Sequence, residues 1–64
     1  MTAFQKNLRR LRLSQGMTQK TLGDLTKLGA AISHYECGQR EPNLANLRAL
    51  KEALNCEYKE FFIP

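Results

Sequence analysis

The side chains best suited to do chemistry in this sequence are basic, and the chemistry they suit is binding to phosphate groups. Of the 64 residues, ten are Lys or Arg and six are Asp or Glu, which gives a net charge of +4. Residues 1–40 hold seven basic and two acidic side chains, whereas residues 41–64 hold three and four. Solubility alone does not require this segregation of charge. We therefore predict a polyanionic partner for the first two-thirds of the chain.

The sequence lacks the side chains needed for metal binding, cofactor binding or catalysis. The single histidine, His34, and the two cysteines, Cys37 and Cys56, provide too few ligands for a zinc site, and no CxxC pair is present. The sequence also has no phosphate-binding loop, no dinucleotide-binding glycine pattern and no nucleophile motif. We expect no metal, no cofactor, no small-molecule ligand and no enzymatic activity. Both thiols are expected to be reduced, as in a cytoplasmic protein.

The length of the chain limits it to one small domain, which we predict over residues 1–64. A chain of this size buries only about 60% of its unfolded surface, so its stability should be marginal. It is too short for a two-domain enzyme or for a built-in ligand sensor. A charged stretch follows the first residues where a signal peptide would be apolar, and no window approaches the roughly 18 apolar residues of a membrane helix.

Apolar residues recur at helical spacing near both ends of the chain. The first helix should end at Gly16, which suits a left-handed cap. Its apolar stripe is Phe4, Leu8, Leu11, Leu13 and Met17. Asn43 is a good N-cap for a later helix. The inward face of that helix is predicted to be Leu44, Leu47, Leu50 and Leu54. A short fifth helix is marked by Tyr58, Phe61 and Phe62.

Two further helices, joined by a short connector, are expected between these. Thr18 is a good N-cap for the first of the two. Gly23 costs that helix about 1 kcal/mol relative to Ala, which indicates that another helix passes close by. The second should run over about 30–37 and stop at Gly38. Expected core positions are Leu22, Leu25, Ile32 and Tyr35. The sequence thus predicts an all-α fold of five short helices with a helix-turn-helix motif at about 18–37.

Particular residues in these elements match a known pattern. They are Gly16, Met17, Thr18, Gln19, Leu22 and Gly23, then Ile32, Ser33, Glu36, Gly38, Arg40 and Pro42, followed by the leucine helix. This combination resembles the Cro/CI-type (XRE-like) helix-turn-helix family of phage repressors, Cro proteins and small bacterial regulators. The resemblance covers residues 8–62 and implies a compact, lambda-repressor-like domain. Between Gln19 and Ile32 the chain is one residue shorter than the family pattern, with Lys27 at the turn glycine and Gly29 at the usual Ser or Thr cap.

The resemblance implies a sequence-specific transcriptional regulator, of the phage or prophage repressor kind, that reads double-stranded DNA. The second helix of the motif would enter the major groove. Expected base contacts are Ala30, Ala31, Ser33 and His34. Alanines can pack on thymine methyl groups but cannot hydrogen-bond a base, so polar reading falls to Ser33 and His34. The alternatives are a Ser33 hydroxyl bonded back to a carbonyl and a His34 imidazole that faces solvent or phosphate.

Phosphate contacts are expected from Thr18, Gln19, Lys27 and Arg40. The side chain of Gln19 and the free N–H groups of the helix that it begins suit a phosphate. Arg40 would be a second phosphate contact, with a solvated loop charge as its alternative. The resemblance also implies a partly buried ion pair between Arg12 and Glu36, which we expect to be structural.

A domain this small reads only a few base pairs, so useful affinity needs two copies on half-sites about one helical turn apart. Candidates for a small self-interface are Phe61, Phe62 and Ile63, unless Phe61 closes the core of the monomer. We expect a weak homodimer favoured on operator DNA, with no membrane partner, in the cytoplasm of a bacterial or phage-infected cell and associated with the nucleoid. The alternative is an antitoxin-like or adaptor module on the same fold, which a large exposed apolar patch would favour.

Overall fold

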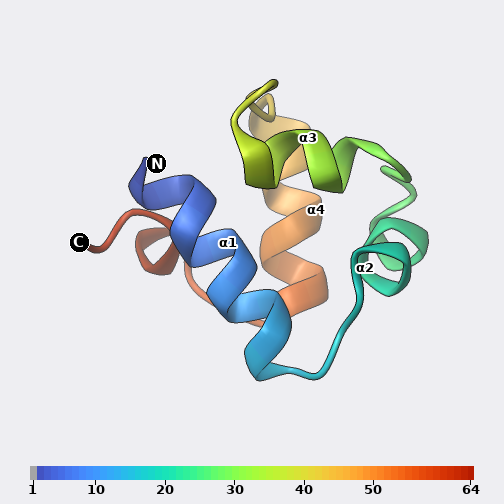
Figure 1. The fold of residues 1–64 in the computed structure, drawn as a ribbon. Coiled ribbons are helices and arrows are strands. Elements are labelled where there is room, and N and C mark those ends of the chain that lie inside the picture. Colours follow the sequence, from blue (N-terminus) through green and yellow to red (C-terminus); the bar gives the residue numbers. More distant parts are fainter. Residues whose placement is uncertain (1) are drawn as a thin grey trace.

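The computed structural model describes residues 2–64, so Met1, the first residue of the predicted domain, lies outside the described part. The described chain forms four α-helices and one short 3-10 helix (Figure 1). In chain order the elements are α1 (Ala3–Ser14), α2 (Gln19–Thr26), α3 (Ala31–Cys37), α4 (Leu44–Leu54) and η1 (Tyr58–Phe61). The all-α prediction is confirmed.

The prediction of a fifth α-helix is wrong, because the last element is a single 3-10 turn of four residues. Its backbone bonds span three residues: the Glu60 N–H donates to the Glu57 carbonyl at 3.0 Å, and the Phe62 N–H to the Lys59 carbonyl at 3.0 Å. A segment this short holds these tighter bonds and does not extend into an α-helical ladder. A capping box between Glu57 and Glu60 closes the turn at its start.

The helix ends follow local sequence signals. The Thr18 hydroxyl accepts a hydrogen bond from the Thr21 N–H at 3.0 Å, and Asn43 Oδ1 accepts one from the Asn46 N–H at 2.8 Å. Both predicted N-caps are therefore confirmed. Gly16 has a φ of +71° just after α1, the left-handed conformation predicted for that position.

The core lies where α1, α2, α3, α4 and η1 meet, with α1 packed against α3 and η1, and α2 against α3 and α4. The buried apolar side chains are Leu8, Leu11, Leu22, Ile32, Tyr35, Leu50, Leu54 and Phe61. Tyr35 is a core residue as predicted, and its hydroxyl accepts a hydrogen bond from Asn46 Nδ2 at 3.0 Å.

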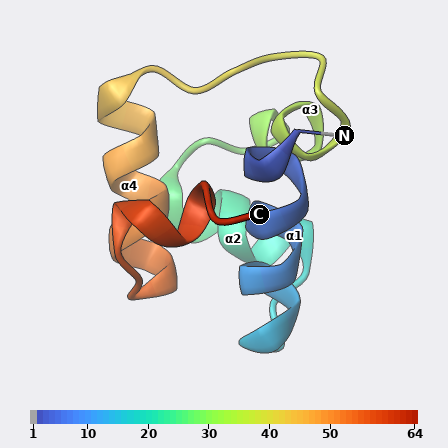
Figure 2. The same cartoon turned by 90° about the vertical axis from the view of Figure 1, so that its left-hand side faces the viewer.

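Three leucines of the predicted apolar faces lie outside the core, and the first of them, Leu13, is 54% exposed. Leu25 is 59% exposed and Leu44 is 76% exposed. Leu25 lies three residues after buried Leu22, and Leu44 lies three residues before partly buried Leu47. The buried stripe of each helix is nevertheless narrower than the apolar pattern. In Figure 2 the first turn of α4 stands at the edge of the molecule, beyond the elements that cover its later turns. Periodicity predicted the helix correctly and the width of its buried face incorrectly.

A buried amide ties the end of the described chain to α1. Asn7 Nδ2 donates to the carbonyl oxygens of Phe61 at 3.0 Å and Ile63 at 2.7 Å. Both ribbon views show the segment after η1 running beside α1 (Figures 1 and 2). Asn7 was not singled out from the sequence, although it lies three residues after Phe4 and four before Leu11, on the apolar face of α1.

The connection between α2 and α3 brings two glycines into contact. A Cβ atom on Gly23 would lie 2.7 Å from the carbonyl oxygen of Gly29, and the Gly29 N–H donates to the Gly23 carbonyl at 3.2 Å. The predicted close approach at Gly23 is present, but its partner is the backbone of the connector and not another helix. Lys27 ends α2 with a φ of +62°, a left-handed conformation that glycine adopts most readily.

Candidate nucleic-acid interface

The first turn of α3 is tight and has no side-chain cap. α3 begins at Ala31, one residue later than predicted, and Ala30 precedes it in a helical conformation without a capping hydrogen bond. The N–H groups of Ala31, Ile32 and Ser33 donate to carbonyls three residues earlier, at 3.2, 3.3 and 3.2 Å. These 3-10 bonds satisfy donors that a capping side chain would otherwise occupy. These three N–H groups at the start of α3 therefore already have hydrogen-bond acceptors within the chain.

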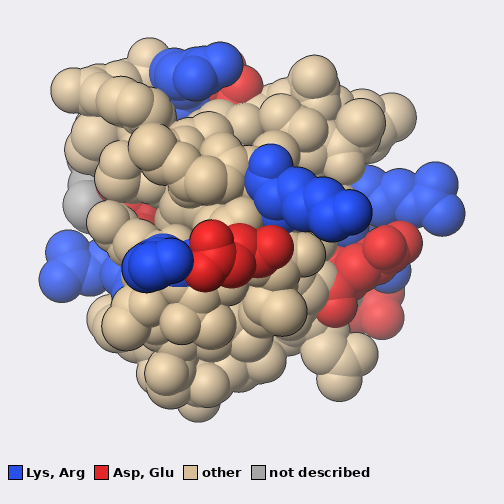
Figure 3. All heavy atoms as spheres, turned by 90° about the vertical axis from the view of Figure 1, so that its right-hand side faces the viewer, with Lys and Arg blue, Asp and Glu red and all other residues tan. Residues whose placement is uncertain are grey.

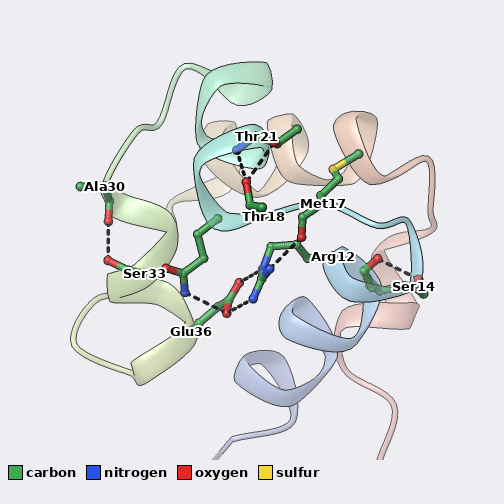
Figure 4. Close-up of polar contacts among 10 residues, drawn as sticks. Arg12, Ser14, Met17, Thr18, Thr21, Ala30, Ser33 and Glu36 are labelled. Atoms are coloured by element: carbon green, nitrogen blue, oxygen red, sulfur yellow. Dashed lines mark hydrogen bonds and ion pairs between the residues drawn. The ribbon is translucent and has the colours of Figure 1, made fainter.

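A shallow depression lies where the start of α2 faces the start of α3. It is lined by Gln19, Lys20, Asp24, Gly29, Ala30 and Ser33. The structure thus brings one predicted phosphate contact, Gln19, next to two predicted base contacts, Ala30 and Ser33. The Ser33 hydroxyl donates to the Ala30 carbonyl at 2.9 Å (Figure 4), which is the alternative arrangement considered for this residue. Its oxygen retains the capacity to accept a hydrogen bond.

His34 is held by Gln39, a residue outside the predicted contacts. Its Nδ1 lies 2.6 Å from Oε1 of Gln39, which follows the Gly38 cap of α3. The half-buried imidazole is therefore anchored on one edge. The five-residue separation of the two partners crosses the end of a helix, and helical spacing does not predict such a contact.

A buried ion pair joins α1 to α3. Arg12 Nε and Nη2 donate to Glu36 Oε2 and Oε1 at 2.6 and 3.0 Å, and the two side chains are only 9% and 6% exposed. Figure 4 shows them pointing toward each other, with Arg12 Nη1 also donating to the Met17 carbonyl at 2.8 Å. Gln19 Nε2 donates to Glu36 Oε1 at 3.2 Å. The pair therefore fixes the position of Gln19 and uses one of its two amide hydrogens.

The remaining phosphate candidates are distributed over the motif. The Thr18 hydroxyl already caps α2 and contacts the Thr21 hydroxyl at 3.0 Å. Lys27 lies at the opposite end of α2 from Gln19, and a helix of eight residues is about 12 Å long. Arg40 is exposed in the loop after α3, and its N–H donates to the His34 carbonyl at 3.4 Å. Only Thr18 and Gln19 are neighbours.

Charge on the face over α2 is broken into separate groups. Figure 3 shows Lys and Arg side chains separated by uncharged surface, some of them beside Asp or Glu. Lys20 Nζ pairs with Asp24 Oδ2 at 3.1 Å, and both side chains are exposed. Such a pair contributes little to stability, but it reduces the positive field of Lys20 near the depression.

The three residues proposed for self-association are not equivalent. Phe61 is fully buried and closes the core, so the expectation that it faces a partner is wrong. Phe62 is 55% exposed and Ile63 is 43% exposed. The Phe62 ring stacks on the Phe4 ring with centroids 6.1 Å apart. Any self-interface at this end of the molecule would involve Phe62 and Ile63.

Three other features that could carry a function are a metal site, the cysteines and a membrane-spanning helix. Within residues 2–64, no three His, Cys, Asp or Glu side chains gather as metal ligands. Both cysteines are free; Cys37 is exposed and Cys56 is half-buried. Burial raises the pKa of the Cys56 thiol, and the negative charge of Glu60 adds to this effect. None of the helices in the described chain combines the length and apolar character needed to cross a bilayer.

Comparison with known proteins agrees with this architecture. A family model described as helix-turn-helix matches residues 8–61. The crystal structure of the restriction-modification controller protein C.AhdI from Aeromonas hydrophila is similar to the chain with a TM-score of 0.89 and 37% sequence identity. The match covers 95% of this chain and 94% of that chain. No curated protein sequence matches the chain.

Proposed function

Because this chain belongs to the Cro/CI-type helix-turn-helix family of DNA-binding regulators, we propose that it recognises specific operator half-sites with α3 in the major groove. The observation that carries this proposal is the depression between α2 and α3, which places Gln19 beside Ala30 and Ser33. A phosphate-binding group next to the start of a groove-entering helix is the arrangement that sets such a helix in register on DNA.

Base recognition is proposed for the four positions expected from the sequence. Ala30 and Ala31 would pack on thymine methyl groups and let the backbone approach the bases. Ser33 would accept a hydrogen bond, since its hydroxyl hydrogen is directed to the Ala30 carbonyl. His34 would present its outer ring nitrogen, Nε2, to a base edge.

Phosphate binding is proposed for Gln19, Thr18, Lys27 and Arg40. Gln19 has one amide hydrogen left after its bond to Glu36. Arg40 and Lys27 are exposed cations on either side of α3 in the sequence. Each of two bound copies would contribute these two cations, which gives four charged contacts to phosphates. The logarithm of affinity should then fall with the logarithm of salt concentration with a slope of about −3.6.

Two copies of the chain are proposed to bind together. The exposed residues Phe62 and Ile63 form a small apolar end that suits a weak interface, so the dimer would assemble mainly on DNA. Sedimentation of wild type and of Phe62→Ser, with and without operator, tests this proposal. Leu13→Ser, at another exposed apolar residue, is the control. A tight wild-type dimer in free solution, or equal behaviour of the two variants, would contradict it.

The regulatory role is proposed from the similarity to a restriction-modification controller protein. A controller of this kind and a phage-type repressor would use the same reading surface. Their operators would differ in genomic position, so the location of the selected sequence in the source genome distinguishes them.

Selection of bound sites from random duplex DNA is the experiment that tests the function. We expect a short sequence repeated with a centre-to-centre spacing of about 10 base pairs. Arg40→Ala should weaken binding to all sequences similarly and make the salt slope shallower by about two for the dimer. Failure to enrich any sequence, together with binding that does not respond to salt, would refute the proposal and favour a protein-binding module.

A further inference from the structure

At the end of α3, Gln39 contacts His34 through both its backbone and its side chain. Gly38 caps the helix with a φ of +81°, and its N–H donates to the His34 carbonyl. The Gln39 and Arg40 N–H groups donate to the same carbonyl at 2.9 and 3.4 Å. With the backbone held in this way, Gln39 Oε1 reaches Nδ1 of the imidazole at 2.6 Å. The contact is therefore built into the helix cap.

This contact determines where the proton of a neutral His34 ring lies. An amide oxygen carries no hydrogen, so Nδ1 must be the donor. In a neutral imidazole the other nitrogen, Nε2, then carries a lone pair and accepts hydrogen bonds. Nε2 is on the far edge of the ring from the backbone, where a base would approach.

We propose that Gln39 determines which bases are preferred at the position read by His34, by keeping the proton on Nδ1 and Nε2 as an acceptor. The inference rests on the proposed function. In the major groove, adenine and cytosine offer an amino group that donates, whereas guanine and thymine offer only acceptors at the corresponding edge. Gln39 is thus a positioning residue that acts through His34, and the preferred bases are adenine and cytosine.

The proton position can be measured in the free protein. The chain contains one histidine, so nitrogen-15 spectra recorded at pH 8.5 assign the ring nitrogens of His34 unambiguously. Wild type should show a protonated Nδ1 and a bare Nε2. Gln39→Leu removes the acceptor from an exposed site and should produce a mixture of both tautomers. A wild-type ring protonated on Nε2, or a Gln39→Leu spectrum equal to wild type, overturns the inference.

The effect on base preference is measured by selection from random duplex DNA at the same pH. Wild type should favour adenine or cytosine at one position of the half-site by about fivefold, the usual value of one net hydrogen bond. Gln39→Leu should lose this preference. Gln39→Glu should keep it, because a carboxylate also accepts from Nδ1. Glu41→Leu, at an exposed side chain two residues further along the same loop, is the matched control and should leave this position unchanged.

The two measurements separate this inference from the function on which it rests. If wild type enriches no sequence, the proposed function fails, and the inferred base preference fails with it, whatever the tautomer. If wild type enriches an operator and Gln39→Leu enriches the same bases at every position, the inference alone is refuted. Loss of preference at one position only, together with the tautomer change, supports it.

Discussion

Replacing Arg12 with Met removes one half of the ion pair between α1 and α3 and leaves the other half buried. The Glu36 carboxylate is 6% exposed, and the Gln19 amide at 3.2 Å would be its remaining polar contact. A single neutral donor at the edge of the site cannot replace a guanidinium that approaches at 2.6 and 3.0 Å. We therefore expect the stranded carboxylate to dominate the cost of the substitution.

The expected loss is about 3–5 kcal/mol in the free energy of unfolding, the usual cost of breaking a buried pair from one side. A 64-residue domain has a total stability of about 3–10 kcal/mol. Arg12→Met should therefore lose between about a third and all of this stability at 25 °C. The double variant Arg12→Met/Glu36→Leu replaces both charges by apolar side chains of similar size. It should recover to within about 2 kcal/mol of wild type, since buried pairs and well-packed apolar replacements are often similar in stability.

Urea unfolding followed by circular dichroism at 222 nm measures these differences. With a slope of about 1 kcal/mol per molar for a domain of this size, each kcal/mol shifts the midpoint by about 1 M. The double variant is the deciding sample, because it must fold cooperatively even if Arg12→Met does not. A double variant as unstable as the sum of the two single variants, or a single variant that loses under 1 kcal/mol, would show that the charges are not coupled in this way.

Three further predictions follow from single positions. Gly23→Ala should destabilise the fold by about 1–2 kcal/mol in urea unfolding, because the new Cβ meets the Gly29 carbonyl oxygen at 2.7 Å; a more stable variant would show that the connector moves freely. Lys27→Gly should stabilise the fold by about 1 kcal/mol, because it relieves a φ of +62°, and should weaken DNA binding in a titration if Lys27 contacts phosphate. At pH 8, iodoacetamide should modify exposed Cys37 before half-buried Cys56, because burial and Glu60 raise the pKa of the Cys56 thiol and lower its thiolate fraction. Peptide mass spectrometry during the reaction would contradict this last prediction if the order were reversed.

Local signals in the sequence predicted the elements, because the groups that determine them are close in the chain. The N-caps Thr18 and Asn43 bind N–H groups three residues later, and the structure has both bonds. Leu25 and Leu44 were placed wrongly because spacing shows which face is apolar but not how far the neighbouring elements extend over it. The burial of Asn7 depends on carbonyls more than fifty residues away, which no local pattern reveals.

The residues of the candidate site could be predicted from the sequence, but the hydrogen bonds between them could not. Family resemblance indicated the residues, whereas the hydrogen bonds among them depend on tertiary geometry. Gln19 contacts Glu36 across two helices. Gln39 contacts His34 only because the Gly38 cap turns the chain back toward the helix. The amide side chains of Gln19 and Gln39 can bind many partners, so residue type alone does not choose one.

The shortened connection before α3 links this fold to the proposed way of reading DNA. Gly29 and Ala30 provide no capping side chain. The backbone N–H groups of the first turn of α3 donate to carbonyl oxygens three residues earlier in the chain. The start of α3 therefore offers methyl groups and shape rather than hydrogen bonds. On the proposed function, hydrogen-bonded discrimination moves one turn along the helix. Because Ser33 already donates to the Ala30 carbonyl, the pair of His34 and Gln39 would supply most of it. Selected half-sites should then combine one strongly discriminated position with neighbours where thymine is favoured by its methyl group, and an evenly specified half-site would contradict this reasoning.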